Sequence, residues 1–194
     1  MALLTENYVR QAAARAKLRF RKNAPEILVE ARNTTNQSFD IFLSHSRLDS
    51  EIVLGVKVVL EEAGQTVYVD WLDDPNLDRS NVTPSTGEKL RSRMRQSKSM
   101  FYVHSGNATK SRWMPWELGY FDGMNGNVAI LPIVQTEQQT SFKGEEYLGL
   151  YPYVDVSNLT SSSFGTIYIH KTFDKYASVQ RWRDSVDKLR PSAF

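Results

Sequence analysis

Phe39-Asp-Ile-Phe-Leu-Ser-His-Ser46 is the stretch of this sequence that decides the fold. Its apolar residues form a short run that suits a buried strand, and polar residues follow directly. The next segment, residues 49–64, has apolar residues at helical spacing, with Asp49 as the expected N-cap and Gly64 at its end. A buried strand followed by an amphipathic helix is the beginning of a βαβ unit, in which the strands lie parallel.

The alternation of strand and helix continues along the chain. Expected strands cover residues 66–70, 100–103, 128–134 and 153–156, with an edge strand at 166–170, and expected helices cover residues 86–97, 113–124 and 173–189. Helices between apolar strands cover both faces of a parallel sheet, and right-handed crossovers limit the strand order. The sequence therefore predicts an α/β fold with a doubly wound parallel sheet.

Residues 1–37 differ in composition from the rest of the chain and are expected to form a basic helical extension. The domain itself is expected to cover residues 38–194 and to close with a C-terminal helix. Thr5 is the expected cap of the extension's helix, which Pro25 should interrupt, and the polar residues 33–38 mark the boundary. A helix docked on the domain with a solvated basic face is the simplest interpretation, and a helix for partner binding or self-assembly is the alternative.

Composition excludes several kinds of protein. The 194 residues are 41% hydrophobic and 24% charged, which is typical of a soluble globular protein. There is no cysteine, so disulfides, thiolate nucleophiles and cysteine-ligated metals are excluded. A formal net charge of +2 gives no reason to expect a nucleic-acid partner. No apolar run approaches the roughly 18 residues that span a bilayer, and the first residues lack a signal-peptide pattern, so we expect a cytoplasmic protein without a membrane partner.

Three loops that leave the expected strands carry the informative polar residues. In an open parallel sheet, ligands bind beyond the carboxyl ends of the strands. The loops at that edge contain Ser44-His-Ser-Arg47, Asp70-Trp-Leu-Asp-Asp74 and residues 105–113. The topology alone therefore predicts that these side chains gather at one edge of the sheet.

The third loop leads into Trp113-Met-Pro-Trp-Glu117. A proline is tolerated in the first turn of a helix but not deeper, so Pro115 places the helix start close to Trp113. Residues four apart share one face, which would bring Trp113 and Glu117 together. Spacing alone favours a plain role for Glu117, as a surface acid that interacts favourably with the helix dipole.

Four segments together resemble the Toll/interleukin-1 receptor (TIR) domain family, over about residues 38–156. The stretch at residues 39–46 resembles the family's opening strand, and Val67-Tyr-Val-Asp70 with its long loop resembles the second strand and the BB loop. Trp113-Met-Pro-Trp-Glu117 fits the W-x-x-x-E motif of the NAD-cleaving members, and residues 129–133 are similar to the fourth strand. The resemblance looks closest to bacterial TIR proteins, many of which act in antiphage defence, including the Thoeris type.

The resemblance implies a flavodoxin-like fold and NAD+ as a consumed substrate. It implies that Glu117 is the key catalytic residue and that the products are nicotinamide and either ADP-ribose or a cyclic or rearranged ADP-ribose. It also implies self-association through TIR domains, and a downstream effector that senses the nucleotide product is a possible partner.

Residues around Glu117 are expected to bind the substrate. These residues are His45, Ser46, Arg47, Asp70, Trp71 and Trp113. The resemblance places His45 and Arg47 in the loop that lines the nucleotide pocket, where Ser46 departs from the doubly basic version of other members. Asp70 corresponds to the acid that ends the family's second strand. The aromatic rings are candidates for holding the flat nicotinamide, and Arg47 for paired hydrogen bonds to the diphosphate.

The expected reaction needs a single carboxylate. Ordinary glycoside hydrolysis uses an acid and a second carboxylate, but nicotinamide leaves NAD+ from a nitrogen that already carries positive charge. A carboxylate beside the ribose stabilises the oxocarbenium charge, orients the ribose hydroxyls or captures the sugar transiently. The three histidines are too scattered to indicate a metal, and there is no Gly-rich phosphate loop. We therefore expect no metal and no recycled cofactor.

Other functions fit the same fold. A non-catalytic TIR scaffold that mediates homotypic protein–protein interaction is the main alternative, although the intact spacing from Trp113 to Glu117 favours an enzyme. A phosphate-relay receiver or a flavin carrier would need paired acids or a phosphate loop after the first strand, and Ser44-His-Ser-Arg47 offers neither. The basic residues between 89 and 98 are expected to form a solvated face, with a nucleic-acid surface as the less favoured interpretation.

Overall fold

The computed structural model describes residues 3–32, 38–70, 84–136, 138–139, 142, 146–157, 166–172 and 175–184. The strands are β1 (Leu4–Thr5), β2 (Phe39–Ser44), β3 (Val67–Val69), β4 (Ser97–His104), β5 (Val128–Val134), β6 (Tyr153–Ser157), β7 (Thr166–His170) and β8 (Tyr176–Ser178). The helices are α1 (Glu6–Phe20), α2 (Ala24–Arg32), α3 (Ser50–Glu62), α4 (Pro84–Arg95), α5 (Trp113–Asn125) and α6 (Val179–Asp184). Two short 3-10 turns are η1 (Ala108–Lys110) and η2 (Glu146–Leu150).

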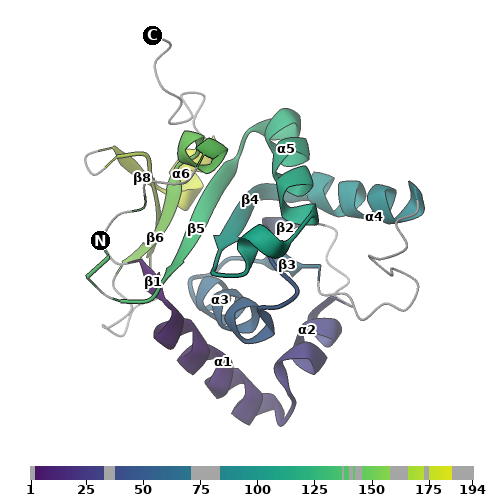
Figure 1. Ribbon diagram of the computed structural model, residues 1–194, viewed down its shortest axis with the longest axis vertical. Coiled ribbons are helices and arrows are strands. Elements are labelled where there is room, and N and C mark those ends of the chain that lie inside the picture. The colour runs from purple at the N-terminus through teal and green to yellow at the C-terminus, as the bar shows by residue number, and fades with distance from the viewer. Residues whose placement is uncertain are drawn as a thin grey trace.

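All strands in the described part of the chain belong to one eight-stranded sheet in the order β3-β2-β4-β5-β6-β7-β8, with β1 paired to β5 (Figure 1). The strands from β3 to β6 run parallel, as does β1, whereas β7 is antiparallel to both of its neighbours, β6 and β8. The predicted doubly wound α/β sheet is therefore confirmed. Its first five positions have the flavodoxin-like order, in which the chain reverses its direction across the sheet between β2 and β4.

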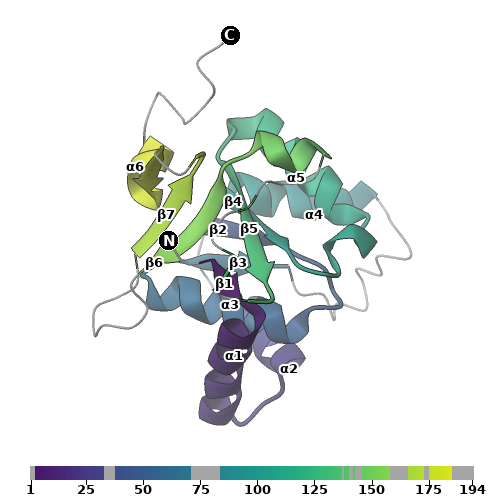
Figure 2. The ribbon, with the colours of Figure 1, turned by 60° about the vertical axis from the view of Figure 1, so that its left-hand side comes forward.

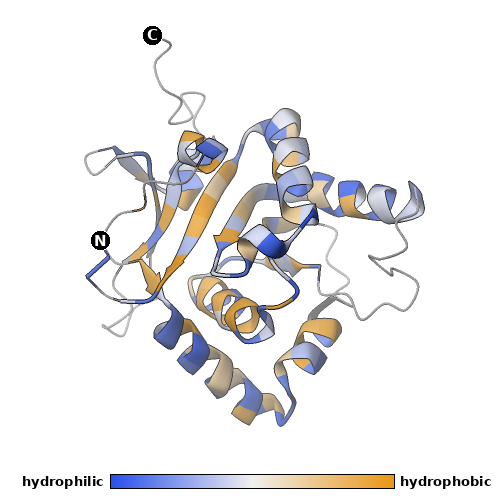
Figure 3. Ribbon diagram, viewed as in Figure 1, coloured by the Kyte–Doolittle hydropathy of each residue, from blue (hydrophilic) through white to orange (hydrophobic). Residues whose placement is uncertain are grey.

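Helices cover both faces of the sheet (Figures 1 and 2). On one face, side chains from α1, α2, α3 and α6 form a core with strand residues such as Ile41, Leu43 and Phe101. On the other face, α4, α5 and η2 pack on strand residues such as Phe42, Met100 and Ile130. The central strands and the inner face of α3 are accordingly apolar, as Figure 3 shows. None of the described helices is long and apolar enough to cross a membrane.

The N-terminal segment docks on this domain through α1. The helix begins where the sequence predicts, because the Thr5 hydroxyl accepts a hydrogen bond from the Tyr8 backbone N–H at 3.2 Å. Its inner face is built of small residues that lie against α3. These are Val9, Ala12, Ala13 and Ala16, all buried. At Gly55 of α3, a β-carbon would lie 1.8 Å from the Val9 carbonyl oxygen, so only glycine permits this approach of the two backbones.

The break between α1 and α2 comes earlier than Pro25. The chain turns at Arg21, whose φ of 54° is left-handed, and α2 begins at Ala24. Pro25 therefore lies in the first turn of α2, where a proline ring is tolerated. The boundary predicted at residues 33–38 lies mostly outside the described residues, and the division of the chain at residue 37 stays a prediction.

The C-terminal part differs from two predictions. Residues 166–170 form a strand as predicted, but β8 pairs with β7 and lies further out, so β7 is not the edge. The helix predicted over 173–189 begins only at Val179, because Tyr176 continues the sheet. Its ring stacks on His170 of β7 at 5.0 Å, and such cross-strand aromatic pairs stabilise a sheet. The described helix ends at Asp184, and residues 185–189 lie outside the described part of the chain.

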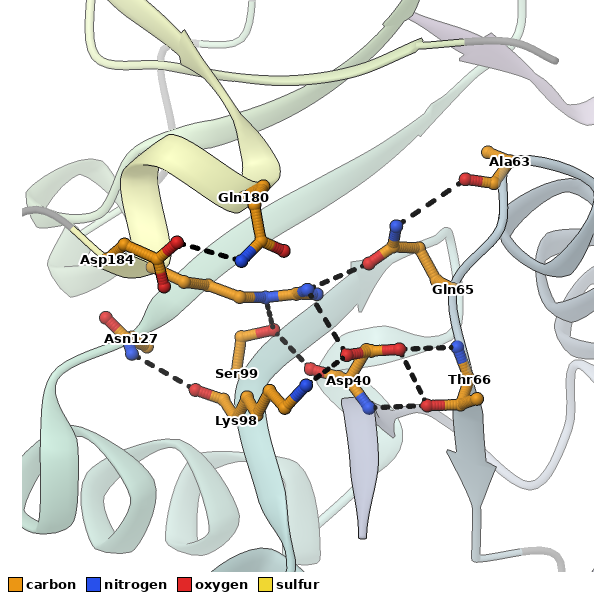
Figure 4. A network of polar contacts seen from close by, with 10 residues as sticks. Asp40, Ala63, Gln65, Thr66, Lys98, Ser99, Asn127, Gln180 and Asp184 are labelled. Atoms are coloured by element: carbon orange, nitrogen blue, oxygen red, sulfur yellow. Dashed lines mark hydrogen bonds and ion pairs between the residues drawn. The ribbon is translucent and has the colours of Figure 1, made fainter.

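Arg183 of α6 reaches across to the amino ends of β2 and β4. Its guanidinium donates to the Ser99 hydroxyl at 3.0 Å and to the Gln65 side chain at 2.9 Å, and it lies 3.7 Å from Asp40. Figure 4 shows Asp40 among its other partners, Lys98 and Thr66. This network ties the last described helix to the sheet.

Candidate active site

The carboxyl ends of β2 and β4 form the point at which the order of the sheet reverses. Ligands of open α/β sheets bind in the crevice at such a point, because the connections on either side leave in opposite directions. Ser44, the last residue of β2, is the direct neighbour of Tyr102 on β4. Both side chains are buried and both face the helix layer of α4 and α5, since Tyr102 packs in that core.

Glu117 reaches this point from α5. The helix begins at Trp113, so Pro115 lies in its first turn as predicted, and the fourth residue after Trp113 turns towards the sheet. The Glu117 side chain is only 2% exposed, and the Ser44 hydroxyl donates to its Oε2 at 2.6 Å. A hydrogen bond this short is typical of a hydroxyl that donates to a charged carboxylate. The interpretation of Glu117 as a surface acid is therefore wrong.

A second hydroxyl lies beside Glu117. Burial, together with the nearby Tyr147 and the negative charge of Glu117, raises the pKa of Tyr102 to about 12. Tyr102 is therefore a neutral hydroxyl at physiological pH, and the acid has hydroxyl neighbours from two strands.

Asp49 links the loop after β2 to the loop after β4, and both loops border the site. It occupies the N-cap position of α3, but its side chain makes no capping bond, contrary to the prediction. Its carboxylate instead accepts hydrogen bonds from the Ser105 hydroxyl and, at 2.7 Å, from the Asn107 amide. Both donors follow β4, so the acid joins the loop after β2 to the loop after β4.

The predicted pocket residues after β2 have different surroundings. His45 is 3% exposed, with its Nδ1 2.8 Å from the Leu43 carbonyl oxygen. The Ser46 hydroxyl is buried and accepts from the Leu48 backbone N–H at 3.4 Å, which belongs to the local turn. Arg47 is exposed. Of the three, Arg47 alone presents its side chain to solvent.

Asp70 lies beside a cavity of about 400 Å³ between β3 and α4. Its described lining residues come from these two elements and the residues directly after them, and they include Tyr68, Leu90 and Arg93, but not Glu117. Asp70 is itself 5% exposed. The structure thus describes Asp70 at a cavity along α4 and Glu117 under α5, while Trp71 lies outside the described residues.

Trp113 stands at the start of a row of aromatic rings along α5. Its ring meets that of Trp116 edge-on at 5.5 Å, and Trp116 stacks on Tyr120 at 5.9 Å. Trp113 is half-buried, and Trp116 is exposed. Within the described residues, no group of three or more His, Asp or Glu side chains is arranged to hold a metal ion.

Tyr102 is absent from the sequence prediction, whereas Ser44 stands in the loop predicted at the ligand edge but without an assigned role. The position of Ser44 at the end of the opening strand is a usable signal, because strand ends define the ligand edge. The signal for Tyr102 needs the register between β2 and β4, which the sequence does not provide.

The chain is similar to known proteins over most of its length. Over 147 residues the chain is 48% identical to "Probable 3' cyclic ADP-D-ribose synthase ThsB'" of Bacillus cereus (strain MSX-D12), which covers 76% of each chain. Over 94 residues it is 32% identical to a protein of Cytobacillus dafuensis whose provisional name is cyclic ADP-D-ribose synthase TIR2, covering 47% of this chain and 25% of that protein. The family profile described as TIR domain matches residues 41–167. The chain therefore belongs to the TIR domain family.

Proposed function

We propose that this protein cleaves the nicotinamide–ribose bond of NAD+ and that Glu117 is its catalytic carboxylate. The observation that carries the proposal is the 2.6 Å bond from Ser44 to Glu117, which holds an acid at the switch point of the sheet. The names of the two relatives support cyclic ADP-ribose as a product for this chain too. A role in antiphage defence is part of the same proposal.

The site suits a reaction in which positive charge moves from the base to the sugar. The bond between the ribose C1 and the nicotinamide nitrogen breaks, and its electron pair neutralises the pyridinium nitrogen. The ribose takes on oxocarbenium character, which the negative charge of Glu117 stabilises. Burial strengthens this attraction, because charges interact more strongly where water is excluded. The Ser44 hydroxyl orients the carboxylate without adding a positive charge that would compete with the sugar.

Because the Glu117 side chain is buried, the proposed reaction includes a step in which the site opens. With 2% exposure, its carboxylate is out of reach of a nucleotide in the conformation described. The residues that cover the Glu117 carboxylate therefore have to move before the substrate binds. We propose that self-association through TIR domains favours the open state, and that a downstream effector senses the product.

The remaining predicted residues have proposed roles in binding. We propose that the exposed Arg47 binds the diphosphate and that the half-buried ring of Trp113 is a surface for the nicotinamide. We keep His45, Ser46, Asp70 and Trp71 as substrate-binding candidates.

A TIR domain that acts only as a scaffold is the second candidate. The covered state of Glu117 favours it, since a scaffold needs no access to that acid. Incubation of the wild-type protein with NAD+ separates the two functions, because only the enzyme releases nicotinamide.

The decisive variant is Glu117→Gln, which keeps the size of the side chain and removes its charge. We expect NAD+ consumption to fall by at least about 100-fold, the scale seen when one electrostatic contact to a transition state is lost. Nicotinamide release, measured by chromatography, is the readout. Glu88→Gln is the matched control, because Glu88 is an exposed acid of α4 that pairs with Arg91 and Arg95. Turnover that survives in Glu117→Gln would remove Glu117 from its assigned role.

A further inference from the structure

Asp49 is a buried acid at the ligand edge of the sheet that the proposed chemistry does not use. It is 5% exposed, and Ser105, whose hydroxyl donates to one of its carboxylate oxygens, is 6% exposed. The Asn107 amide donates to the other oxygen at 2.7 Å. Both oxygens are therefore bonded to the loop after β4, while the side chain makes no capping bond to its own helix, α3.

On its own side of this contact, Asp49 closes the turn that carries Arg47. The Asp49 backbone N–H donates to the Ser46 carbonyl oxygen at 3.1 Å, as in a β-turn, and the Leu48 backbone N–H donates to the Ser46 hydroxyl at 3.4 Å. Ser46 is buried, whereas Arg47 is exposed. The position of Arg47 relative to the rest of the site therefore depends on where Asp49 is held.

On the other side, hydrogen bonds lead from Asp49 to the beginning of α5. Asn107 directly precedes the turn η1, and its backbone N–H donates to the Ser105 hydroxyl at 3.2 Å. At the other end of η1, the Ser111 hydroxyl accepts a hydrogen bond from the Met114 backbone N–H at 3.3 Å. Met114 lies in the first turn of α5, the helix that carries the catalytic acid.

We propose that Asp49 is a positioning residue that holds the turn of Arg47 in a fixed place relative to the beginning of α5. The inference rests on the proposed function, in which Arg47 binds the diphosphate of NAD+ and Trp113 contacts the nicotinamide. It adds to that function a residue that acts through the two loops, without contact to the substrate.

The chemistry of NAD+ explains why such a link matters. The diphosphate and the nicotinamide are joined by one ribose, so the groups that bind them have to stand at a matching separation. A site that holds this separation before the substrate arrives does not spend binding energy on ordering its loops. Without the two bonds of Asp49, the substrate has to order them, and the loss appears in KM. The effect on kcat should be smaller, because the Ser44 hydroxyl holds Glu117 separately.

The test measures KM and kcat for NAD+ in two variants of Asp49. Asp49→Ala removes both bonds to the loop after β4, and we expect KM to rise about tenfold while kcat stays within about threefold of the wild type. Asp49→Asn keeps the size of the side chain. Its amide oxygen accepts from Asn107 and its amide nitrogen donates to the Ser105 hydroxyl oxygen, so KM should stay within about threefold of the wild type.

A control variant and a double variant separate positioning from a general loss of stability. Asp40→Asn is the matched control, because Asp40 is an acid at the opposite end of β2 that is held by Thr66 and Lys98. It should lose stability without a change in KM. The double variant Asp49→Ala/Asn107→Ala should have the same KM as Asp49→Ala, because two residues that act through one contact do not have additive effects.

The possible outcomes separate the inference from the function on which it rests. A wild-type protein that consumes no NAD+ overturns both. With an active wild type, an unchanged KM in Asp49→Ala, or a loss confined to kcat, overturns the inference alone and leaves NAD+ cleavage standing. An Asp49→Asn variant as impaired as Asp49→Ala, or an equal rise of KM in Asp40→Asn, also overturns it.

A second variant covers the case in which Asp49→Ala does not fold. Asn107→Ala removes one of the same two bonds from a side chain that is only partly buried and makes no capping bond to η1. KM should again rise, and an unchanged KM in this variant overturns the inference.

Discussion

Asp40 and Glu117 are two acids that lie at opposite ends of strand β2 and have different neighbours. Asp40 belongs to the amino end of the strand, where Lys98 donates to it at 2.9 Å and Arg183 lies 3.7 Å away (Figure 4). The backbone N–H and the hydroxyl of Thr66 also donate to its carboxylate. Glu117 lies at the carboxyl end, where the Ser44 hydroxyl donates to it.

The surroundings of Asp40 stabilise its charged form. Burial by itself would raise the pKa of Asp40, but the hydrogen bonds from Thr66 and Lys98 and the charge of Arg183 outweigh it and lower the pKa to about 2. Burial lowers the pKa of Arg183, whereas its attraction to Asp40 raises it. Since an arginine pKa starts far above neutrality, the guanidinium stays charged, and the titration of Asp40 decides how this network responds to acid.

The difference between the two sites distinguishes an acid that stabilises the fold from an acid available for chemistry. A carboxylate surrounded by cations is already neutralised, so it contributes to stability and has little charge to offer a substrate. A hydrogen bond from a neutral hydroxyl orients a carboxylate without itself neutralising the charge that would stabilise a cationic transition state. Substitutions at the amino end of β2 should therefore alter stability alone. Substitutions at its carboxyl end should alter NAD+ turnover alone.

The largest expected effect is the loss of stability in Arg183→Met. Removing the buried guanidinium of this network should cost about 3 kcal/mol, because the buried Ser99 hydroxyl and the partly buried Asp40 carboxylate both lose their contact with it. Urea denaturation should show this loss, while NAD+ turnover per folded molecule stays within about twofold of the wild type. A variant that folds normally but loses turnover would break the comparison, because it would couple the amino end to the chemistry.

Ser44→Ala is the corresponding change at the carboxyl end. A hydrogen bond to a charged group contributes about 2 kcal/mol, so kcat should fall by about 30-fold. KM should change little, since Ser44 positions the acid and does not hold the nucleotide. Steady-state kinetics and a thermal melt are the measurements, and Ser44→Thr, which keeps a hydroxyl, should recover most of kcat. If Ser44→Thr were as impaired as Ser44→Ala, a loss of packing would explain both better than a lost hydrogen bond.

The periodicity of the apolar residues predicted most of the fold. Apolar runs and helical spacing gave the parallel strands and the helices between them, because each element shows its own repeat. The strand β1 and the helix α2 were not predicted, and neither was β8. The three residues of β8, Tyr-Ala-Ser, are too few to show alternation and stand directly before helical spacing from Val179. Cross-strand stacking on β7 makes them a strand, and that is a tertiary effect.

The site shows a different limit of sequence reasoning. The motif Trp113-Met-Pro-Trp-Glu117 identified the acid, but an acid near a helix start has the same pattern whether it is exposed or buried. The buried Glu117 carboxylate accepts a hydrogen bond from Ser44, which lies 73 residues earlier in the chain. Only the fold brings these two residues together. Asp49 shows the same effect, since its predicted capping role is replaced by bonds to Ser105 and Asn107.

The smallest expected effect is the pH dependence of Asp40→Asn, and it measures how strongly the cations neutralise Asp40. The pKa of Asp40 falls from an ordinary 3.8 to about 2 on folding, so its stabilisation is complete above pH 3.8 and is lost as the pH falls through 2. The wild type should be more stable than the variant by up to about 2 kcal/mol at neutral pH. This advantage should vanish towards pH 2 in urea denaturation at a series of pH values.

Because both proteins share every other titrating group, the difference between their curves isolates Asp40. A constant difference across that pH range would mean that Asp40 titrates normally in the folded protein, and the contrast with Glu117 would then lose its electrostatic basis.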